Sequence, residues 1–122
     1  MTRGEIWLVS FDPAIGDEIQ KMRPAAIVSG DVYGVLRLRL VVPITGWQEA
    51  FAARPWMIEI APTPGNGLSK QSAADAFQVK SLSTRRFVRR IGRAADEQLG
   101  AIAEAIAHLV GFAPEAAGEQ EE

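Results

Sequence analysis

The apolar residues of this chain fall into short runs up to about residue 91, and after residue 95 they recur at a helical period. The short runs are rich in β-branched and aromatic side chains, and Pro, Gly, Asp or Asn residues separate them, which is the pattern of β-strands. The expected strands cover residues 5–11, 24–29, 35–42, 56–60, 73–79 and 87–91.

The third of these runs shows the clearest alternation. Leucines occupy one face and arginines the other, in the order Leu36, Arg37, Leu38, Arg39 and Leu40. A period of two places the two residue types on opposite sides of a strand. Pro43 follows the run, and we expect it to end the strand because proline cannot donate to a ladder.

The segment from Asp96 onward predicts one amphipathic helix. Its apolar residues form a single stripe at helical spacing, namely Leu99, Ile102, Ala103, Ile106, Leu109 and Val110. Asp96 is the expected N-terminal cap, because Ala95 before it has no capping oxygen, and Gly111 suits the position just after the helix. Several short strands followed by one helix predict a mainly β protein, a small curved sheet or barrel with a helix packed on it.

The composition is that of one folded domain. The chain has 122 residues, of which 48% are hydrophobic, and we expect a domain over residues 1–112 and a disordered acidic tail over 113–122. No apolar run approaches the roughly 20 residues of a membrane-spanning helix, and no charged-then-apolar leader opens the chain. A cytoplasmic protein is therefore expected. The absence of cysteine excludes disulfides, thiolate nucleophiles and Cys-ligated zinc.

Charge is unevenly distributed along the chain. The net charge is −2, but the last ten residues carry four glutamates, whereas residues 80–93 hold six basic residues and no acidic one. Such a cationic stretch can bind a polyanion through phosphate contacts. It is equally compatible with a solvated strand-and-turn surface, so charge alone leaves both interpretations open.

The sequence gives little support for a catalytic histidine, a metal centre or a phosphate-binding loop. His108, the only histidine, falls opposite the apolar stripe of the expected helix, one turn after Glu104, and we expect it to face solvent. Asp12, Asp17 and Glu18 lie close in sequence but lack a further ligand at a recognisable spacing, so no metal centre and no cofactor are expected. The glycines of residues 65–67 lack the Lys-Ser/Thr pair of a phosphate-binding loop.

Arg23 and Thr45 are the remaining candidates for chemistry. Arg23 precedes Pro24, which favours an extended backbone at Arg23 and so a fixed base for its guanidinium. Thr45 stands just after the strand that we expect to end at Pro43. Two such side chains at strand ends of a small sheet could converge on one phosphate, for which arginine offers a rigid fork of donors. Sequence statistics taken alone favour a surface position for Arg23 and a capping role for Thr45.

The N-terminal sequence GEIWLVSFDPAIGDEIQKMRPAAIVS closely resembles the opening of the MazF/PemK family of toxin endoribonucleases. The resemblance continues through residues 42–45 (VPIT), 77–81 (FQVKS) and 91–93 (IGR), the last leading into an Asp-Glu-x-Leu helix start. It covers roughly residues 3–112 with the motifs in register. Each motif alone is weak, but together they are strong.

The resemblance implies a fold, an assembly and a reaction. The fold is a small SH3-like barrel of the CcdB/PemK (MazF) type with a C-terminal helix, and the assembly is a homodimer. The reaction is metal-independent cleavage of single-stranded RNA, in which the 2′-hydroxyl attacks the adjacent phosphate to leave a 2′,3′-cyclic phosphate and a 5′-hydroxyl. Arg23 and Thr45 match the family's catalytic pair. Arg23 would stabilise the charged transition state, and Thr45 would hold the phosphate.

Four more residues are assigned by the same resemblance. Glu18 matches a loop glutamate linked to substrate binding and proton transfer; because arginine keeps its proton, a carboxylate or the substrate must accept one. Gln78 matches a position that reads an RNA base, and Lys80 would neutralise a phosphate. Trp47 would stack a splayed base, or else pack at the rim of the barrel. A cognate antitoxin, MazE-like with an acidic disordered segment, is the implied partner.

The chain departs from the family pattern at two positions near the expected RNA groove. Phe77 stands where members often have an acidic residue, and Ile19 stands where they often have glutamine. The cleavage motif therefore cannot be transferred. The alternative function is that of CcdB, a non-enzymatic gyrase-binding toxin on the same fold; the Arg-Pro and Pro-x-Thr pairing and the GEQEE terminus favour the nuclease. A family member that binds RNA or antitoxin without cutting stays open.

Overall fold

A computed structural model describes residues 1–112; the expected acidic tail, residues 113–122, lies outside the described residues. The strands are β1 (Glu5–Ser10), β2 (Met22–Ile27), β3 (Leu38–Gly46), β4 (Met57–Ile60), β5 (Ser72–Asp75), β6 (Lys80–Ser83) and β7 (Phe87–Arg93). They are followed by one α-helix, α1 (Asp96–Leu109), and short 3₁₀ turns join several of them. The mainly β class with a C-terminal helix is confirmed.

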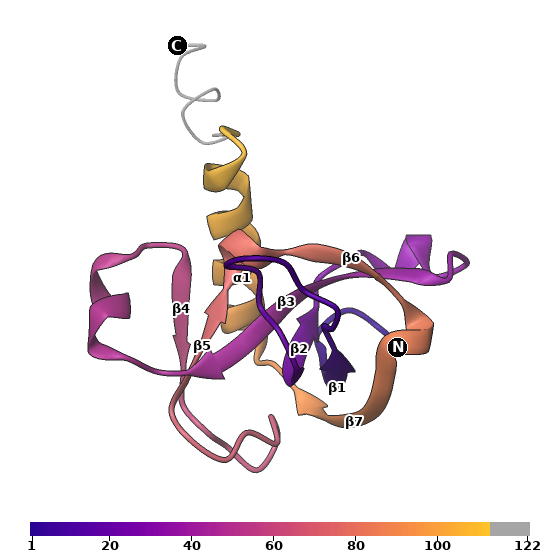
Figure 1. Ribbon diagram of the computed structural model, residues 1–122, viewed down its shortest axis with the longest axis horizontal. Helices are drawn as coiled ribbons and strands as arrows, with labels where there is room; N and C mark the ends of the chain where they lie inside the picture. Colours follow the sequence, from indigo (N-terminus) through magenta and orange to yellow (C-terminus); the bar gives the residue numbers. More distant parts are fainter. Residues whose placement is uncertain (113–122) are drawn as a thin grey trace.

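The strands form one curved antiparallel sheet in the order β4-β5-β3-β2-β1-β7, with β6 also paired to β3. Figure 1 shows the sheet bending strongly, with α1 against one side and its C-terminal end projecting beyond the strands. The helix contacts β4 and the 3₁₀ turn η3 (Ala76–Gln78). Within residues 1–112 no helix is long and apolar enough to span a bilayer, since α1 has 14 residues.

The sheet is buried on both faces at its centre. On the helix side, Ile6 and Ile44 pack with Ile102 of α1. On the other side, Phe11 and Ile27 belong to a second buried cluster. Because both faces are covered there, residues 24–27 of β2 and 41–44 of β3 are continuous apolar runs rather than alternating ones.

The third strand continues through Pro43, contrary to the expectation that proline ends it. On the side away from β2, β3 pairs with β6 up to Val41 and with β5 from Ile44 onward. Pro43 lies in the gap between these two ladders, where no partner strand requires its missing N–H. The extension matters for the site, because it carries Thr45 within the strand rather than after it.

The leucine face of this strand is exposed rather than packed. Leu36, Leu38 and Leu40 are 53%, 49% and 45% exposed. These side chains line a shallow surface cavity together with Tyr33, and none of them belongs to a buried cluster of the core. On the opposite face, Arg39 donates to backbone carbonyls, among them Leu36 O at 2.7 Å and Met1 O at 3.0 Å.

The single strand expected over residues 73–79 is wrong, because the chain turns within it. Ser72–Asp75 pairs with the second half of β3 and Lys80–Ser83 pairs with the first half, and the three residues of η3 are looped out between them. Asp75 stabilises the turn, since its Oδ1 accepts from Phe77 N at 3.1 Å. The turn also directs Gln78 away from the β3 ladder.

The helix begins one residue earlier than a cap at Asp96 would require. Ala95 occupies the N-cap position without a side-chain hydrogen bond, and Asp96 is the first helical residue. Its charge still favours the N-terminal end of the helix. At the other end, Gly111 has a φ of +83°, the left-handed conformation expected for glycine after a helix.

Candidate functional site

Arg23 and Thr45 lie opposite each other where β2 and β3 separate. The pairing of these strands ends at Ala25 and Pro43, and the same register continued by two positions places Arg23 across from Thr45. Arg23 Nη1 donates to Thr45 Oγ1 at 3.3 Å, and Arg23 Nε donates to the Gln20 carbonyl at 2.9 Å. The convergence expected from the sequence is therefore observed. The Gln20 contact fixes the guanidinium, whose remaining N–H groups stay available.

Both residues line a surface cavity of about 460 Å³. Its other walls come from β1, β7 and the loop of residues 67–70. The charged residues of the lining are Arg23, Lys70 and Arg89, and the lining includes no Asp, Glu or His. A concave surface with cations and no acid attracts anions. The Thr45 hydroxyl and the Arg23 guanidinium are donors suited to phosphate oxygens.

The loop that forms one wall of the cavity is held by a buried asparagine. Asn66 is 2% exposed, and its Oδ1 accepts from both Thr63 N and Leu68 N at 3.0 Å. Two glycines let this loop lie directly on β7: a Cβ at Gly67 would sit 2.0 Å from Ile91 O, and one at Gly92 would sit 2.3 Å from the Asn66 carbonyl carbon. This wall is thus fixed by backbone packing.

Glu18 and Gln78 are brought together on a different part of the surface. The Gln78 side chain binds the backbone on both sides of Glu18. Its Oε1 accepts from Ile19 N at 2.8 Å, and its Nε2 donates to Asp17 O at 3.1 Å. Glu18 is exposed, and its Oε1 accepts from Ile15 N at 2.9 Å. Neither side chain is part of the lining of the Arg23–Thr45 cavity. Their roles in proton transfer and base reading stay predictions.

Trp47 and Lys80 flank the site without lining the cavity. The Trp47 ring packs edge-on against Phe51, with centroids 5.7 Å apart, and the residue is half-buried. This agrees with the rim position that the sequence left open, and part of the ring surface stays accessible. Lys80 is half-buried on β6 opposite Val41.

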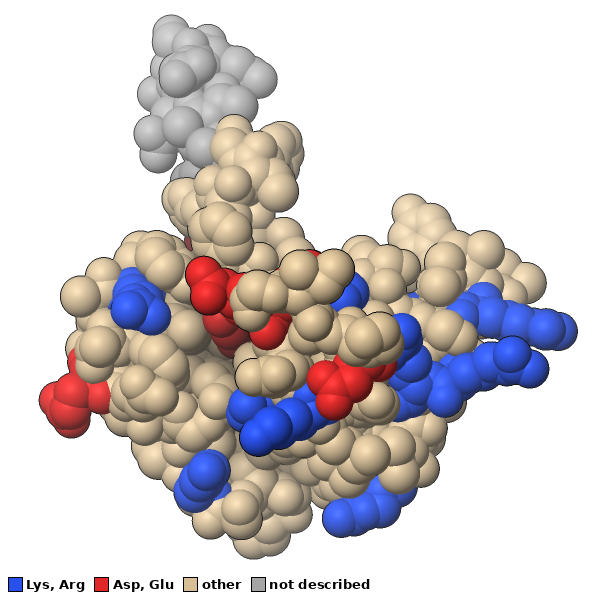
Figure 2. All heavy atoms as spheres, in the orientation of Figure 1, with Lys and Arg blue, Asp and Glu red and all other residues tan. Residues whose placement is uncertain are grey.

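The basic stretch of residues 80–93 is divided between structural and accessible positions. Arg86 donates to the carbonyls of Ser10 and Asp12, and Arg93 donates to Arg3 O at 3.0 Å. Figure 2 shows basic side chains spread over the lower and right-hand parts of one face, with acidic groups between them. The stretch is thus not a single uniform patch.

His108 is exposed, as expected from its place on the helix. The ion pairs found among residues 1–112 both involve Glu5, so the expected pairing of His108 with Glu104 is not formed. Its place in the last turn of α1 suits a cation.

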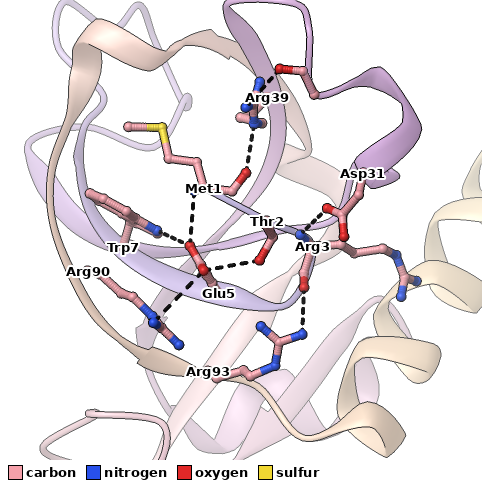
Figure 3. Close-up of polar contacts among 10 residues, drawn as sticks. Met1, Thr2, Arg3, Glu5, Trp7, Asp31, Arg39, Arg90 and Arg93 are labelled. Carbon is pink, nitrogen blue, oxygen red and sulfur yellow. Dashed lines mark hydrogen bonds and ion pairs between the residues drawn. The ribbon is translucent and has the colours of Figure 1, made fainter.

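Among residues 1–112, the carboxyl groups of Glu5 and Asp75 have shifted pKa values, and both groups hold structural hydrogen bonds. Burial acts to raise the pKa of Glu5, but hydrogen bonds from Trp7 Nε1 (2.8 Å) and Thr2 (3.0 Å) and the nearby N-terminal ammonium outweigh it and lower the pKa to about 2. Figure 3 shows Glu5 at the centre of these contacts, with Arg90 alongside. Burial raises the pKa of Asp75, opposed by backbone N–H groups of the η3 turn.

The reasoning from sequence missed two cavity residues, Lys70 and Arg89. Lys70 follows the segment 63–69 (TPGNGLS), whose composition is that of a turn, and Arg89 belongs to the basic stretch of residues 80–93 without a feature that distinguishes it there. Strand alternation could have separated Arg89 from Arg90, because adjacent residues of a strand face opposite sides and Arg90 faces Glu5. The position of Lys70 depends on long-range loop packing and has no local signal.

Comparison with known proteins finds similarity to this chain in both sequence and fold. Residues 2–110 match the family described as PemK-like, MazF-like toxin of type II toxin-antitoxin system. Endoribonuclease MazF9 of Mycobacterium tuberculosis is 37% identical over 112 residues, which cover 87% of this chain and 92% of that protein.

Solved structures agree with the fold. MazF from Deinococcus radiodurans superimposes with a TM-score of 0.79 at 24% identity, covering 92% of this chain and 97% of the other. A MazE-MazF structure from the same organism gives 0.70 at 21% identity, covering 93% and 97%. With a family match over nearly the whole described chain and the Arg23–Thr45 pair in place, this protein belongs to the PemK-like, MazF-like toxins of type II toxin–antitoxin systems.

Proposed function

We propose that this chain is the toxin enzyme of its system, an endoribonuclease that cuts single-stranded RNA without a metal ion. The observation that carries the proposal is the Arg23 Nη1–Thr45 Oγ1 contact of 3.3 Å inside a cationic cavity. The similarity to Endoribonuclease MazF9 over most of both chains supports the same activity. A gyrase-binding role of the CcdB type is not favoured, because the family matched is that of the PemK and MazF toxins.

In the proposed reaction the ribose 2′-oxygen attacks the adjacent phosphorus. The O2′–P bond forms, the P–O5′ bond breaks, the 2′-hydroxyl proton passes to a base, and the leaving 5′-oxygen takes a proton from the Arg23 guanidinium or from water. The Arg23 guanidinium stabilises the negative charge that builds up on the phosphoryl oxygens. Thr45 accepts a hydrogen bond from Arg23, so its own hydroxyl proton is free to donate to the phosphate.

The proton acceptor is proposed to be Glu18 or the substrate itself. The cavity lining contains no carboxylate or imidazole. For Glu18 to act, its carboxylate must leave the Ile15 amide that it now binds. Because Glu18 is not part of the cavity lining, the loop that carries it must also move toward the scissile phosphate.

RNA recognition is proposed to extend from the cavity toward Gln78, Lys80 and Trp47. The Gln78 amide already binds the backbone of Asp17 and Ile19, so a base read by Gln78 would replace these bonds. Trp47 follows Gly46 in the same segment as Thr45 and offers a partly accessible ring for stacking. Lys80 would neutralise a phosphate outside the cavity.

Two protein partners are proposed. A cognate antitoxin with an acidic segment would compete with RNA for the cationic cavity, consistent with the MazE-MazF complex among the similar structures. A second copy of the chain would cover Tyr33, Leu36, Leu38 and Leu40, which are all exposed and line one shallow surface cavity. Because mRNA is the natural substrate of such an enzyme, the cytoplasm is its proposed location.

A direct test incubates the purified protein with a long RNA in EDTA and maps the new ends. The expected result is cleavage at a short sequence motif, with 2′,3′-cyclic phosphate and 5′-hydroxyl ends. Arg23→Ala, prepared in parallel, is expected to lose cleavage, whereas Arg37→Ala, which removes an exposed charge outside the cavity, is expected to keep it. Cleavage that requires added Mg²⁺, or that persists in Arg23→Ala, would overturn the proposal.

A further inference from the structure

The cavity holds more positive charge than one cleaved phosphate requires. Three cations line it, Arg23, Lys70 and Arg89, and no acidic residue does. None of the three takes part in an ion pair among residues 1–112. Arg23 is engaged with Thr45 and Gln20, but neither Lys70 nor Arg89 uses its side chain in a hydrogen bond within that range. Their charges are therefore available to a ligand.

Lys70 is built into the wall of the cavity rather than left on a loose loop. Its backbone carbonyl accepts from Ser72 Oγ at 2.8 Å. Its ammonium lies 3.1 Å from the place where a Cβ at Gly46 would be, so the side chain lies close against the Gly46 backbone. Gly46 directly follows Thr45, and Asn66 anchors the loop that leads to Lys70.

Arg89 reaches the cavity from the other side. It lies on β7 opposite Leu8 of β1, and Leu8 is itself part of the cavity wall. The next residue, Arg90, pairs with Glu5 at 3.9 Å. Consecutive arginines of this strand thus have different partners: Arg90 supports the N-terminal segment, and Arg89 is left to the cavity.

We propose that Lys70 and Arg89 form a second phosphate subsite, which holds the RNA phosphate next to the one that Arg23 and Thr45 cleave. This inference rests on the proposed endoribonuclease function and adds two substrate-binding residues to it. An RNA strand brings one negative charge per nucleotide, so a strand that places one phosphate at Arg23 must place another nearby. The subsite binds and aligns the backbone without reading sequence, and the larger share of its effect falls on KM.

The test measures binding of an uncleavable 2′-O-methyl RNA, which contains the cleavage motif, at several salt concentrations. Each of Lys70→Ala and Arg89→Ala is expected to weaken binding about tenfold. Each is also expected to lower the slope of log K against log salt by about 0.7, the value for one lost phosphate contact on a single strand. Arg37→Ala, which removes an exposed charge outside the cavity, is the matched control and is expected to leave the slope unchanged.

A neutral methylphosphonate placed next to the scissile position, on either side in turn, locates the contact. At one of the two positions it is expected to weaken binding by the wild type more than by Lys70→Ala or Arg89→Ala, because each variant has already lost one of the two contacts to that phosphate. Equal losses in all three proteins, or variants that behave like Arg37→Ala while the wild type binds and cleaves, would overturn the subsite alone. A wild type that neither binds nor cleaves RNA would overturn the proposed function together with the subsite.

Discussion

Arg23 and Thr45 are joined by a hydrogen bond in which the guanidinium donates and the hydroxyl accepts, at 3.3 Å. The direction of this bond matters, because it leaves the Thr45 hydroxyl proton and the remaining N–H groups of Arg23 available to an anion in the cavity that both residues line. Two donors from neighbouring strands are thus held ready for one anion. Such preorganised donors are the main source of transition-state stabilisation when charge builds up on oxygen.

Gln78 is expected to fix the loop that carries Glu18. Gln78→Ala removes the hydrogen bonds to Ile19 N and Asp17 O. Because one hydrogen bond contributes about 1 kcal/mol, the Ile19 amide is expected to exchange with deuterium several-fold faster, as measured by NMR. Gln48→Ala, at an exposed residue far from this loop in sequence, serves as the control. Unchanged exchange at Ile19 would show that the loop is held by other contacts.

Glu5 is expected to make stability depend on pH in the acid range. Its pKa in the folded protein is about 2, below the ordinary value of 4.5. The stabilisation is therefore present above pH 4.5 and is lost as the pH falls from 4.5 toward 2. Glu5→Ala also leaves the Trp7 indole N–H unpaired, so we expect the free energy of unfolding to fall by about 1–3 kcal/mol at pH 7. Below pH 4.5, the unfolding free energy of this variant is expected to depend less on pH than that of the wild type.

Urea unfolding of Glu5→Ala at several pH values measures both effects. Glu49→Ala is the matched control, because the Glu49 carboxylate is exposed and makes no side-chain hydrogen bond or ion pair within residues 1–112. If the unfolding free energy of Glu5→Ala falls below pH 4.5 as steeply as that of the wild type, Glu5 is not the source of the pH dependence.

Gly92 is expected to be required for the loop that carries Lys70. A Cβ there would lie 2.3 Å from the Asn66 carbonyl carbon, which is backbone and cannot rotate away. Gly92→Ala is expected to lower the free energy of unfolding by about 2–4 kcal/mol, measured by chemical denaturation. Gly100→Ala, on the exposed side of α1 with nothing within 4 Å of the new Cβ, is expected to raise it by about 0.5–1 kcal/mol. Equal effects of the two substitutions would refute this account of the loop.

The exposed leucines of β3 are expected to form the contact between two copies of the chain. Leu38→Glu combined with Leu40→Glu places two charges in that face and is expected to convert a dimer into a monomer, as measured by light scattering after gel filtration. Val110→Glu changes a residue that is 74% exposed at the end of α1 and is expected to leave the dimer intact. If Val110→Glu separates the subunits and the leucine variant does not, the interface lies elsewhere.

The sequence predicted the fold best where patterning and position agree. The strand starting at Glu5, the helix from Asp96 and the meeting of Arg23 with Thr45 follow from apolar periodicity and from the place of each residue at a strand end. The motif GEIW could be recognised but not explained. Its glutamate proves to be a structural anchor for Trp7 and the N-terminus.

The errors share a physical cause, which is long-range contact. Pro43 is tolerated because two other strands leave a gap beside it. Lys70 reaches the cavity because Gly46 and Asn66 shape its surroundings. In each case, the deciding residue is distant in sequence or absent from the local pattern.

The central claim is that Arg23 and Thr45 act as one unit on one phosphate. Its most direct test compares single-turnover RNA cleavage in EDTA by Arg23→Ala, Thr45→Val and the double variant. Each single change is expected to slow cleavage by about 10²–10³, and the double variant is expected to be little slower than the worse single one, because residues that act together are not additive. A double variant whose loss equals the product of the two single losses, or a single variant that keeps the wild-type rate, would contradict the account.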